Sequence, residues 1–555
     1  MNKLYFGDNL EILRDKIPSG CVDLIYLDPP FQSGKNYNQI FQPQAAGIKG
    51  ATAQIKAFED TWQWGEEAER EYQGLITGTI TQEKPGQKLI DLLKAMRAYL
   101  GECPMMAYLA MMAPRLVEMR RVLKNTGSVY LHCDSTASHY LKLLMDAIFE
   151  FKNMRNEIIW QKIRTEKSQS NQFAKLHDII FFYTKSEQYA FNQSRLPLSQ
   201  EYIDKYYNQV EPKTGRRYQL ISFLQGGQGQ SRNFGDKWLE PPMGRHWIWS
   251  QERIDEAIRK GLLVFTDPKK PRLKRYLDEY GGRNIGNIWT DIYPINAVAK
   301  ERLGYPTQKP EALLERIIKA SSNEGDLVLD PFCGCGTTVA VAQRTNRKWI
   351  GIDVTYLAID IIKKRLEKNG IKEGVDFGID GEPTDAYSAE MLAKKSPFDF
   401  QYWCLSRLDA TPSPTKSGDQ GVDGIINFPD PTKPDKFGKG IVSVKGTQAV
   451  NPAMVRDLKG TIASQKADFG ILITLKNPTQ GMTVEAVKEG MAHYEYSKGT
   501  KQYKIPKIQI LTVDDLFKKP IPVKLPPVVM AVHKDTRQSD DKKWSKEKQA
   551  ELELQ

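Results

Sequence analysis

The chain has 555 residues, of which 40% are apolar and 26% charged, and its formal net charge is +11. These values are close to those of globular domains and exclude a collagen-like, mucin-like or wholly disordered chain. No apolar run reaches the roughly 18 residues of a membrane span, no signal-peptide core opens the chain, and the six cysteines lack C-x-x-C spacing, so we expect a cytoplasmic protein without disulfides.

The first 150 residues alternate between strand and helix patterns. The apolar run Val22–Leu27 predicts a buried strand that stops at Asp28-Pro29-Pro30-Phe31, because two prolines cannot continue a central strand. Residues 92–124 and 139–149 have helical apolar spacing, and residues 128–133 between them predict a strand. Such alternation is typical of a parallel sheet with crossover helices.

From about residue 155 to 300 the alternation fades and basic residues are interleaved with aromatic ones. Residues 151–300 hold 25 Lys+Arg and 16 Asp+Glu, so this segment carries +9 of the total charge. Basic side chains neutralise phosphates and aromatic rings stack on bases, which favours DNA contact over a merely solvated face. The candidate contacts are Arg216, Arg217, Arg232, Lys237, Arg245, Trp247, Lys269 and Lys270.

Alternation resumes at residue 309, and a glycine-rich loop, Asp330 to Thr338, separates a predicted strand from a helix. Glycines let the backbone approach a ligand closely, and a carboxylate such as Asp353, after the next strand, binds ribose hydroxyls in α/β sheets. The loop has neither the third glycine of the dinucleotide motif nor a phosphate-binding Gly-Lys-Thr. We therefore expect a nucleoside-like cofactor with little phosphate, and S-adenosylmethionine fits.

The motif Asp28-Pro29-Pro30-Phe31 suits methylation of an exocyclic amine on a base. The amine lone pair is delocalised into the ring, so acceptors that bond its hydrogens favour the nucleophilic form and stabilise developing positive charge. Asp28 supplies one acceptor and the Pro29 carbonyl a second, while Phe31 offers a ring on which a flipped-out base stacks.

Together these motifs resemble the β group of DNA amino-methyltransferases, in which the catalytic motif precedes the cofactor motif and the target-recognition region lies between them. Gly7-Asp8-Asn9 and Tyr305-Pro306-Thr307-Gln308-Lys309-Pro310 are also similar to family elements, and the resemblance covers about residues 1–370. It implies N6-adenine transfer, because N4-cytosine members usually begin the catalytic motif with serine. The implied catalytic residues are Asp28, Pro29, Pro30 and Phe31, and the implied cofactor-binding residues are Asp8, Lys309, Asp330, Phe332, Gly334, Gly336, Thr337, Thr338 and Asp353.

The C-terminal unit resembles the Mrr-like branch of the PD-(D/E)XK nuclease fold. Asp423 and Lys445 match that family's motif, but Ser443 stands where it has glutamate or glutamine. A hydroxyl is a poor substitute for a carboxylate as a Mg²⁺ ligand, so Mg²⁺ on Asp423 and cleavage require Glu390 or Asp419 to complete the site. An active nuclease and a DNA-binding remnant both remain open.

The expected architecture is α/β: a doubly wound S-adenosylmethionine-dependent methyltransferase fold with an inserted target-recognition region and a second, nuclease-like α/β domain. The predicted divisions are residues 1–155 (catalytic part), 156–300 (target recognition), 301–372 (cofactor-binding part), 375–525 (nuclease-like domain) and 527–555 (disordered tail). The expected partner is double-stranded DNA in a restriction-modification or phage-defence system, with no membrane. Three questions stay open. The target base could be cytosine, methylated at N4, and the enzyme could also cleave DNA through its C-terminal domain. The protein could also form a homodimer or bind a restriction or defence subunit.

Overall fold

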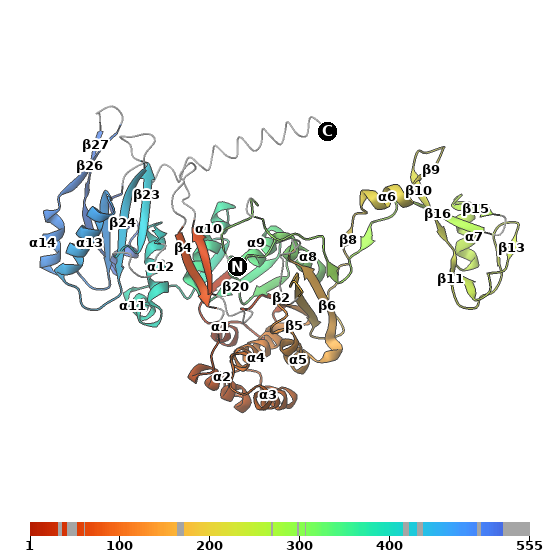
Figure 1. Ribbon diagram of the computed structural model, residues 1–555, viewed down its shortest axis with the longest axis horizontal. Helices are drawn as coiled ribbons and strands as arrows, with labels where there is room; N and C mark the ends of the chain where they lie inside the picture. Colours follow the sequence, from red (N-terminus) through yellow and green to blue (C-terminus); the bar gives the residue numbers. More distant parts are fainter. Residues whose placement is uncertain are drawn as a thin grey trace. The chain divides into compact units, whose positions relative to one another are not determined.

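The computed structural model divides into two compact units, one of Met1–Phe191 with Ile288–Gln555 and one of Asn192–Asn287 (Figure 1). Each unit is considered by itself. The structure describes residues 1–30, 36–41, 53–59, 62–163, 171, 173–267, 270–296, 299–305, 307–413, 421–429, 437–496 and 501–525.

A nine-stranded sheet forms the centre of the first unit. Its strands are, in spatial order, β18 (Ile288–Trp289), β6 (Met154–Gln161), β7 (His177–Thr184), β5 (Leu123–Cys133), β2 (Val22–Leu27), β19 (Leu327–Asp330), β20 (Lys348–Asp353), β1 (Asn2–Phe6) and β21 (Phe377–Asp380). The six strands from β5 to β21 pair in parallel, whereas β7 is antiparallel to both of its neighbours. Long apolar runs such as that of β2 suit such strands, which are buried on both faces.

Eight helices accompany this sheet among the described residues: α1 (Asn9–Lys16), α2 (Glu66–Thr77), α3 (Gln87–Leu100), α4 (Pro104–Val122), α5 (Ser138–Phe149), α8 (Glu311–Ser321), α9 (Thr337–Arg344) and α10 (Tyr356–Lys368). A short 3₁₀ turn, Phe151–Asn153, follows α5, and a hairpin pairs β3 (Asn36–Phe41) with β4 (Ala53–Glu59).

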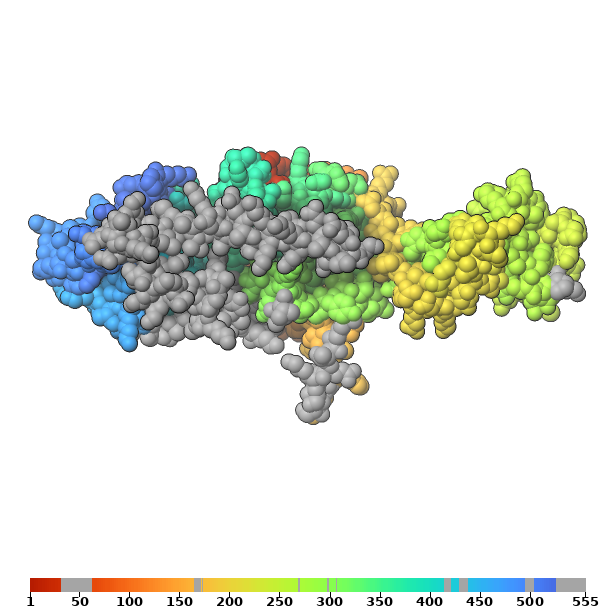
Figure 2. Space-filling model, turned by 90° about the horizontal axis from the view of Figure 1, so that it is seen from above, coloured from red at the N-terminus to blue at the C-terminus, as the bar shows by residue number. Residues whose placement is uncertain are grey.

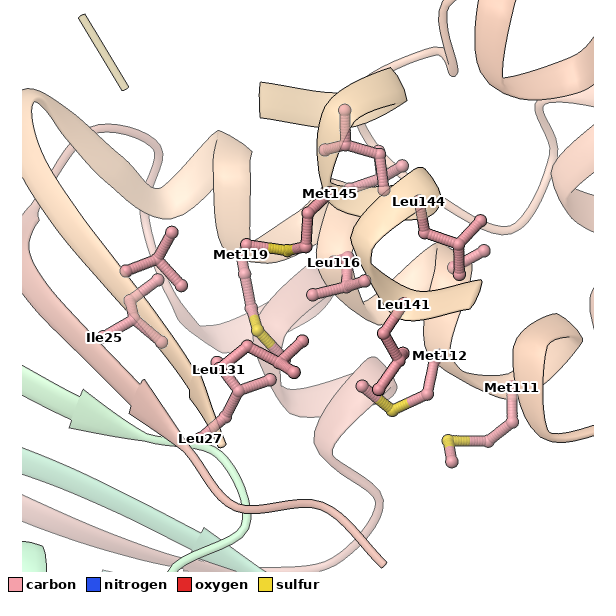
Figure 3. Close-up of a cluster of buried hydrophobic side chains, with 14 of the residues drawn as sticks. Ile25, Leu27, Met111, Met112, Leu116, Met119, Leu131, Leu141, Leu144 and Met145 are labelled. Atoms are coloured by element: carbon pink, nitrogen blue, oxygen red, sulfur yellow. The ribbon is translucent and has the colours of Figure 1, made fainter. Parts of the chain in front are cut away.

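The largest apolar cluster packs α1, α3, α4 and α5 against one face of the sheet. Figure 3 shows Leu141, Leu144 and Met145 of α5 meeting the side chains of α4 above Ile25 and Leu131 of the strands. Interiors this closely packed hold the strand ends in fixed positions.

The strand register places the two predicted motifs side by side. β2 and β19 are neighbours near the middle of the sheet, with Ile25 beside Leu329. Because parallel strands end at the same edge, Asp28 and Asp330 emerge at one place. At this place β2 is followed along the chain by its neighbour β5 on one side, whereas β19 is followed by its neighbour β20 on the other side. Open α/β sheets form their binding crevices where the direction of strand order changes in this way.

The second unit is smaller and mainly antiparallel. It contains β8 (Arg195–Leu196), α6 (Gln200–Tyr206), β9 (Gln209–Val210), β10 (Arg217–Ser222), β11 (Leu224–Gly226), β12 (Arg232–Asn233), β13 (Trp238–Leu239), β14 (Arg245–Trp247), α7 (Gln251–Arg259), β15 (Leu263–Asp267), β16 (Lys270–Tyr276) and β17 (Arg283–Asn284). Figure 2 draws its surface in yellow and yellow-green. The aromatic side chains Phe223, Phe234 and Trp247 pack in its core together with Ile254, Ala257 and Leu273.

A C-terminal domain within the first unit has its own sheet, in the order β22 (Thr411–Pro412), β23 (Gly424–Pro429), β24 (Phe437–Lys445), β25 (Phe469–Thr474) and β28 (Ile508–Thr512). Its other elements are α11 (Ala386–Lys395), α12 (Pro397–Arg407), α13 (Pro452–Ser464), α14 (Gln480–Lys488), β26 (Met491–Tyr496), β27 (Lys501–Pro506) and α15 (Val513–Leu516). Figure 1 colours this domain from teal to blue.

The predicted fold class, a doubly wound α/β fold with a second α/β domain, is confirmed, but two of the predicted boundaries shift. Residues 156–191 supply most of β6 and all of β7, so the separate unit starts at Asn192 rather than at 156. β21 pairs with β1 and thus belongs to the large sheet, which moves the start of the C-terminal domain past residue 380. The predicted tail, 527–555, lies outside the described residues. Among the helices that the structure describes, none has the length and apolar character needed to cross a bilayer.

Candidate active site

A cavity of about 500 Å³ opens at the edge of the sheet where β2 and β19 end. Its lining brings together most of the predicted site residues from distant parts of the sequence: Asp8, Asp28, Pro29, Pro30, Lys309, Asp330, Phe332, Gly334, Thr337, Thr338 and Asp353. A volume of this size suits a ligand as large as a nucleoside derivative.

The glycine loop forms one wall of the cavity. Asp330, at the end of β19, is buried and accepts a hydrogen bond from the Phe332 N–H, and burial raises the pKa of its carboxyl to about 7. Gly334 has φ +50°, and a Cβ there would lie 3.3 Å from the Tyr305 ring. The absence of a side chain therefore lets the Tyr305 ring pack against the loop, and Gly334 lines the cavity with backbone atoms alone.

Asp353 holds the next loop in place from the end of β20. One carboxylate oxygen accepts the Gly334 N–H at 2.9 Å, and the other accepts the backbone N–H and the hydroxyl of Thr355 at 2.9 and 2.7 Å. Burial raises the pKa of Asp353 to about 6, and these hydrogen bonds oppose that rise. A carboxylate has about four acceptor positions and three are used here, so about one remains for a hydroxyl of a ligand.

Asp28 faces the same cavity from the end of β2. One of its oxygens forms an ion pair with Lys309 Nζ, and both side chains are largely buried. The other oxygen, Oδ1, is buried and has no hydrogen-bond partner among the residues that the structure describes. Because an unsatisfied buried carboxylate oxygen is unfavourable, this atom has the capacity to accept a hydrogen bond from a ligand.

Asp8 lies in the cavity lining, but its carboxylate already has protein partners. It caps α1 by accepting the Leu10 N–H at 2.7 Å and pairs with Arg115 Nη2 at 3.1 Å. Arg115 is buried and also pairs with Glu71 at 2.8 Å. Asn9 accepts from Arg115 Nε and donates to the carbonyl of Pro331, which ties this network to the glycine loop.

Tyr26, Arg115 and Tyr305 are among the cavity residues to which sequence reasoning assigned no role. Tyr26 had a usable signal, because it stands two residues before Asp28 on one strand and so shares its face of the sheet. Arg115 gave none, since it lies within an apolar helix far from either motif. Tyr305 belongs to the element before Lys309, but only the fold reveals that its ring packs beneath Gly334.

Among the predicted cofactor-binding residues, all of which the structure describes, Gly336 alone does not line the cavity. Gly336 has φ +74°, and a Cβ there would come within 2.6 Å of Ile362 of α10, so this glycine permits helix packing. Phe31 lies outside the described residues. Cys333 and Cys335 also line the cavity, but both are buried, and burial raises the pKa of both thiols, which disfavours the thiolate that a metal would need.

The predicted DNA contacts lie in the second unit, with the exception of Lys269, which is outside the described residues. Lys237, Arg245 and Lys270 are exposed, and Arg232 is half-buried. Arg216 pairs with Asp278 and Glu279, and Arg217 pairs with Asp204. Trp247 is buried in the core and donates to the Leu239 carbonyl, so its role there is packing.

The nuclease-like residues meet at the end of β24. Asp423 Oδ2 accepts the Val444 N–H at 2.6 Å and lies 3.4 Å from Ser443 Oγ. Glu390 binds Lys394 and Lys476, and these partners lower its pKa to about 2. In the part of the chain that the structure describes, no three His, Cys, Asp or Glu side chains form a group able to hold a metal ion. Asp419 lies outside the described residues.

Comparison with known proteins gives two family matches. Residues 22–364 match the N6/N4-type DNA methylase family, and residues 399–517 match a family described as NACHT-associated inactive restriction endonuclease 1. The C-terminal match is thus to an inactive endonuclease family, and the predicted Mrr-like identity is not confirmed.

Individual relatives agree with the first match. The type II methyltransferase M.EcaI of Enterobacter cloacae is 33% identical over 261 residues, which cover 47% of this chain and 57% of the relative. The DNA adenine methyltransferase YhdJ of Escherichia coli K12 is 26% identical over 389 residues, 70% of this chain and 85% of the relative. The structure of the cytosine-N4-specific PvuII DNA methyltransferase aligns at 14% identity and a TM-score of 0.31, over 67% of this chain and 89% of that one. The chain therefore spans little more than half the length of M.EcaI.

Proposed function

The chain belongs to the N6/N4-type DNA methylase family, and we propose that it transfers a methyl group from S-adenosylmethionine to the exocyclic N6 of adenine in DNA. One observation carries the proposal: the buried acceptor Asp28 Oδ1 and the glycine-loop cradle share one cavity. A base presented to Asp28 would therefore lie beside a ligand held by Gly334 and Asp353.

The residues around the cavity fit S-adenosylmethionine. Asp353 has the carboxylate for ribose hydroxyls, Gly334 allows a close backbone approach, and Lys309 supplies a cation for a carboxylate group. When bound, this cofactor supplies a methyl group already activated by its sulfonium, so the transfer itself needs no metal. The protein must then orient the target amine and accept hydrogen bonds from its N–H groups.

Asp28 performs that task in the mechanism we propose. Its Oδ1 accepts a hydrogen bond from the target amine, and the Pro29 carbonyl accepts the second hydrogen. Both interactions strengthen as positive charge develops on nitrogen, which is the condition for lowering a barrier rather than only binding the substrate. Proline has no N–H, so the Pro29-Pro30 segment presents acceptors alone.

The aspartate that opens the Asp-Pro-Pro motif supports adenine over cytosine as the target. The test is to incubate unmethylated DNA with the protein and S-adenosylmethionine, digest it to nucleosides and identify the product by mass spectrometry. We expect N6-methyladenine. N4-methylcytosine would overturn the adenine assignment, and unmodified DNA would overturn methyl transfer as a whole.

The second unit supports double-stranded DNA as the substrate. Its exposed Lys237, Arg245 and Lys270 suit phosphate contacts, which are sensitive to salt. We assign target recognition to this unit and place the protein in a restriction-modification system, in which a methyltransferase marks host DNA.

We propose that the C-terminal domain does not cleave DNA. Asp423 Oδ2 already accepts the Val444 N–H and the Ser443 hydroxyl, and Ser443 contributes no charge. We therefore expect unmethylated plasmid to stay intact with Mg²⁺ and either the wild type or Asp423→Ala. A linear product that appears with the wild type and is absent with Asp423→Ala would establish an active nuclease.

A further inference from the structure

The loop that carries Asp353 depends on a side chain from the C-terminal domain. A helix begins with N–H groups that have no partner within the helix, and the residue before it usually accepts one of them. Thr355 precedes α10, but its hydroxyl donates to Asp353 and does not cap the helix. Asp399 of α12 takes this place, and its Oδ1 accepts the Tyr356 N–H at 2.9 Å.

Asp399 is itself held in position. It lies in the first turn of α12, its second oxygen accepts the Ser396 hydroxyl at 2.6 Å, and the side chain is half-buried. The two oxygens of one carboxylate thus join the start of α12 to the start of α10. Tyr356 directly follows Thr355, whose N–H and hydroxyl both donate to Asp353.

The side chain of Tyr356 also holds the start of α10 in place. Its ring is 3% exposed and belongs to the apolar cluster of the C-terminal domain, with Phe400 and Trp403. Its hydroxyl donates to Glu382 at 2.8 Å and accepts from Ser406 at 3.3 Å. The first residue of α10 is therefore a core residue of the neighbouring domain.

A second contact connects α12 with the glycine loop. Tyr402 packs against the small cluster of Tyr305, Cys335 and Leu357. Tyr305 and Cys335 line the cavity, and Tyr305 is the ring that limits the space at Gly334. One helix of the C-terminal domain thus supports both the glycine loop and the Asp353 loop.

From these contacts we infer that the C-terminal domain is a structural part of the cofactor site, with Asp399 as a positioning residue for the Asp353 loop. The inference rests on the proposed function, because it takes the cavity to bind S-adenosylmethionine. It gives a role to a domain that, as proposed above, does not cleave DNA. If the loop leaves its binding-competent arrangement in part of the molecules, the apparent affinity equals the intrinsic affinity multiplied by the fraction of molecules that remain competent.

The test compares the binding of S-adenosylmethionine to full-length variants by titration calorimetry. Asp399→Ala removes the cap and should weaken binding by roughly 3- to 30-fold, the range expected for loss of a helix cap. Asp399→Asn keeps an acceptor oxygen and should restore most of the affinity. In the methylation assay, Asp399→Ala should raise KM for the cofactor while kcat at saturation stays close to the wild type.

Asp385→Ala is the matched control. Asp385 caps α11 inside the C-terminal domain by accepting the Ser388 N–H at 2.7 Å, but it is not bonded to the Asp353 loop. This variant should bind the cofactor as the wild type does. Hydrogen exchange of the Thr355 and Tyr356 amides, measured on the folded protein, should rise in Asp399→Ala alone.

The outcomes separate the two proposals. If the wild type binds no S-adenosylmethionine, the proposed function fails. If the wild type binds it and Asp399→Ala binds equally well, the role of Asp399 is refuted. Equal losses in Asp385→Ala and Asp399→Ala would also refute it, because they would indicate only a loss of domain stability.

Discussion

Asp28→Asn should reduce methyl transfer by about 100- to 1,000-fold, the loss seen when one preorganised group that stabilises transition-state charge is removed. The amide has nearly the same shape as the carboxylate, but it carries no charge and offers only one acceptor oxygen. It therefore no longer stabilises the positive charge that develops on the target nitrogen. The binding of S-adenosylmethionine should change little, because the Asp353 loop and the glycine loop keep all of their contacts. Single-turnover methylation and calorimetric titration measure the two quantities separately.

Asp23→Asn provides the control on the same strand. Asp23 also forms an ion pair with a lysine, Lys124, at 2.8 Å, but it lies at the opposite end of β2 from the cavity. This variant should methylate DNA at a rate close to that of the wild type. Normal methylation by Asp28→Asn would contradict the proposed mechanism. An equal loss of methylation in both variants would indicate that the substitutions disturb β2, and it would also contradict a specific role for the Asp28 charge.

The fold and the two motifs of the site were predictable because they depend on local pattern. The strand that ends at Asp28 and the glycine loop after Asp330 follow from apolar runs and from the positions of proline and glycine. Once both are assigned to parallel strands, their meeting at one edge of the sheet follows from geometry.

Long-range side-chain pairs were not predictable. Asp8 was expected to bind the cofactor, but its carboxylate is bonded to Arg115, which lies more than one hundred residues away. The dependence of α10 on Asp399 is of the same kind. Thr355 is a residue type that caps helices, and only the structure shows its hydroxyl turned to Asp353 instead. Trp247 illustrates a further limit, since composition does not separate an aromatic core residue from one that stacks on a base.

Asp353→Asn should weaken the binding of S-adenosylmethionine by about 10- to 100-fold at pH 8, because a hydrogen bond to a charged group contributes about 1.5–3 kcal/mol. The reason lies in the ionised form of the carboxylate, which accepts ribose hydroxyls more strongly than an amide does. Asp376→Asn, an exposed change in the segment between α10 and β21, is the control and should bind normally.

The same variant should also change the pH dependence of binding. Burial raises the pKa of Asp353 to about 6, so the carboxyl becomes protonated as the pH falls through that value and loses acceptor strength. Wild-type affinity should therefore decrease as the pH falls from 8 to 5, and Asp353→Asn should lack the part of this decrease centred near pH 6. Asp330 has a pKa of about 7 and is present in both proteins. The informative quantity is therefore the ratio of the wild-type affinity to the Asp353→Asn affinity at each pH. A ratio that stays constant from pH 8 to pH 5 would show that the ionisation of Asp353 does not control cofactor binding, whereas a ratio that shrinks toward low pH supports the carboxylate as the ribose acceptor.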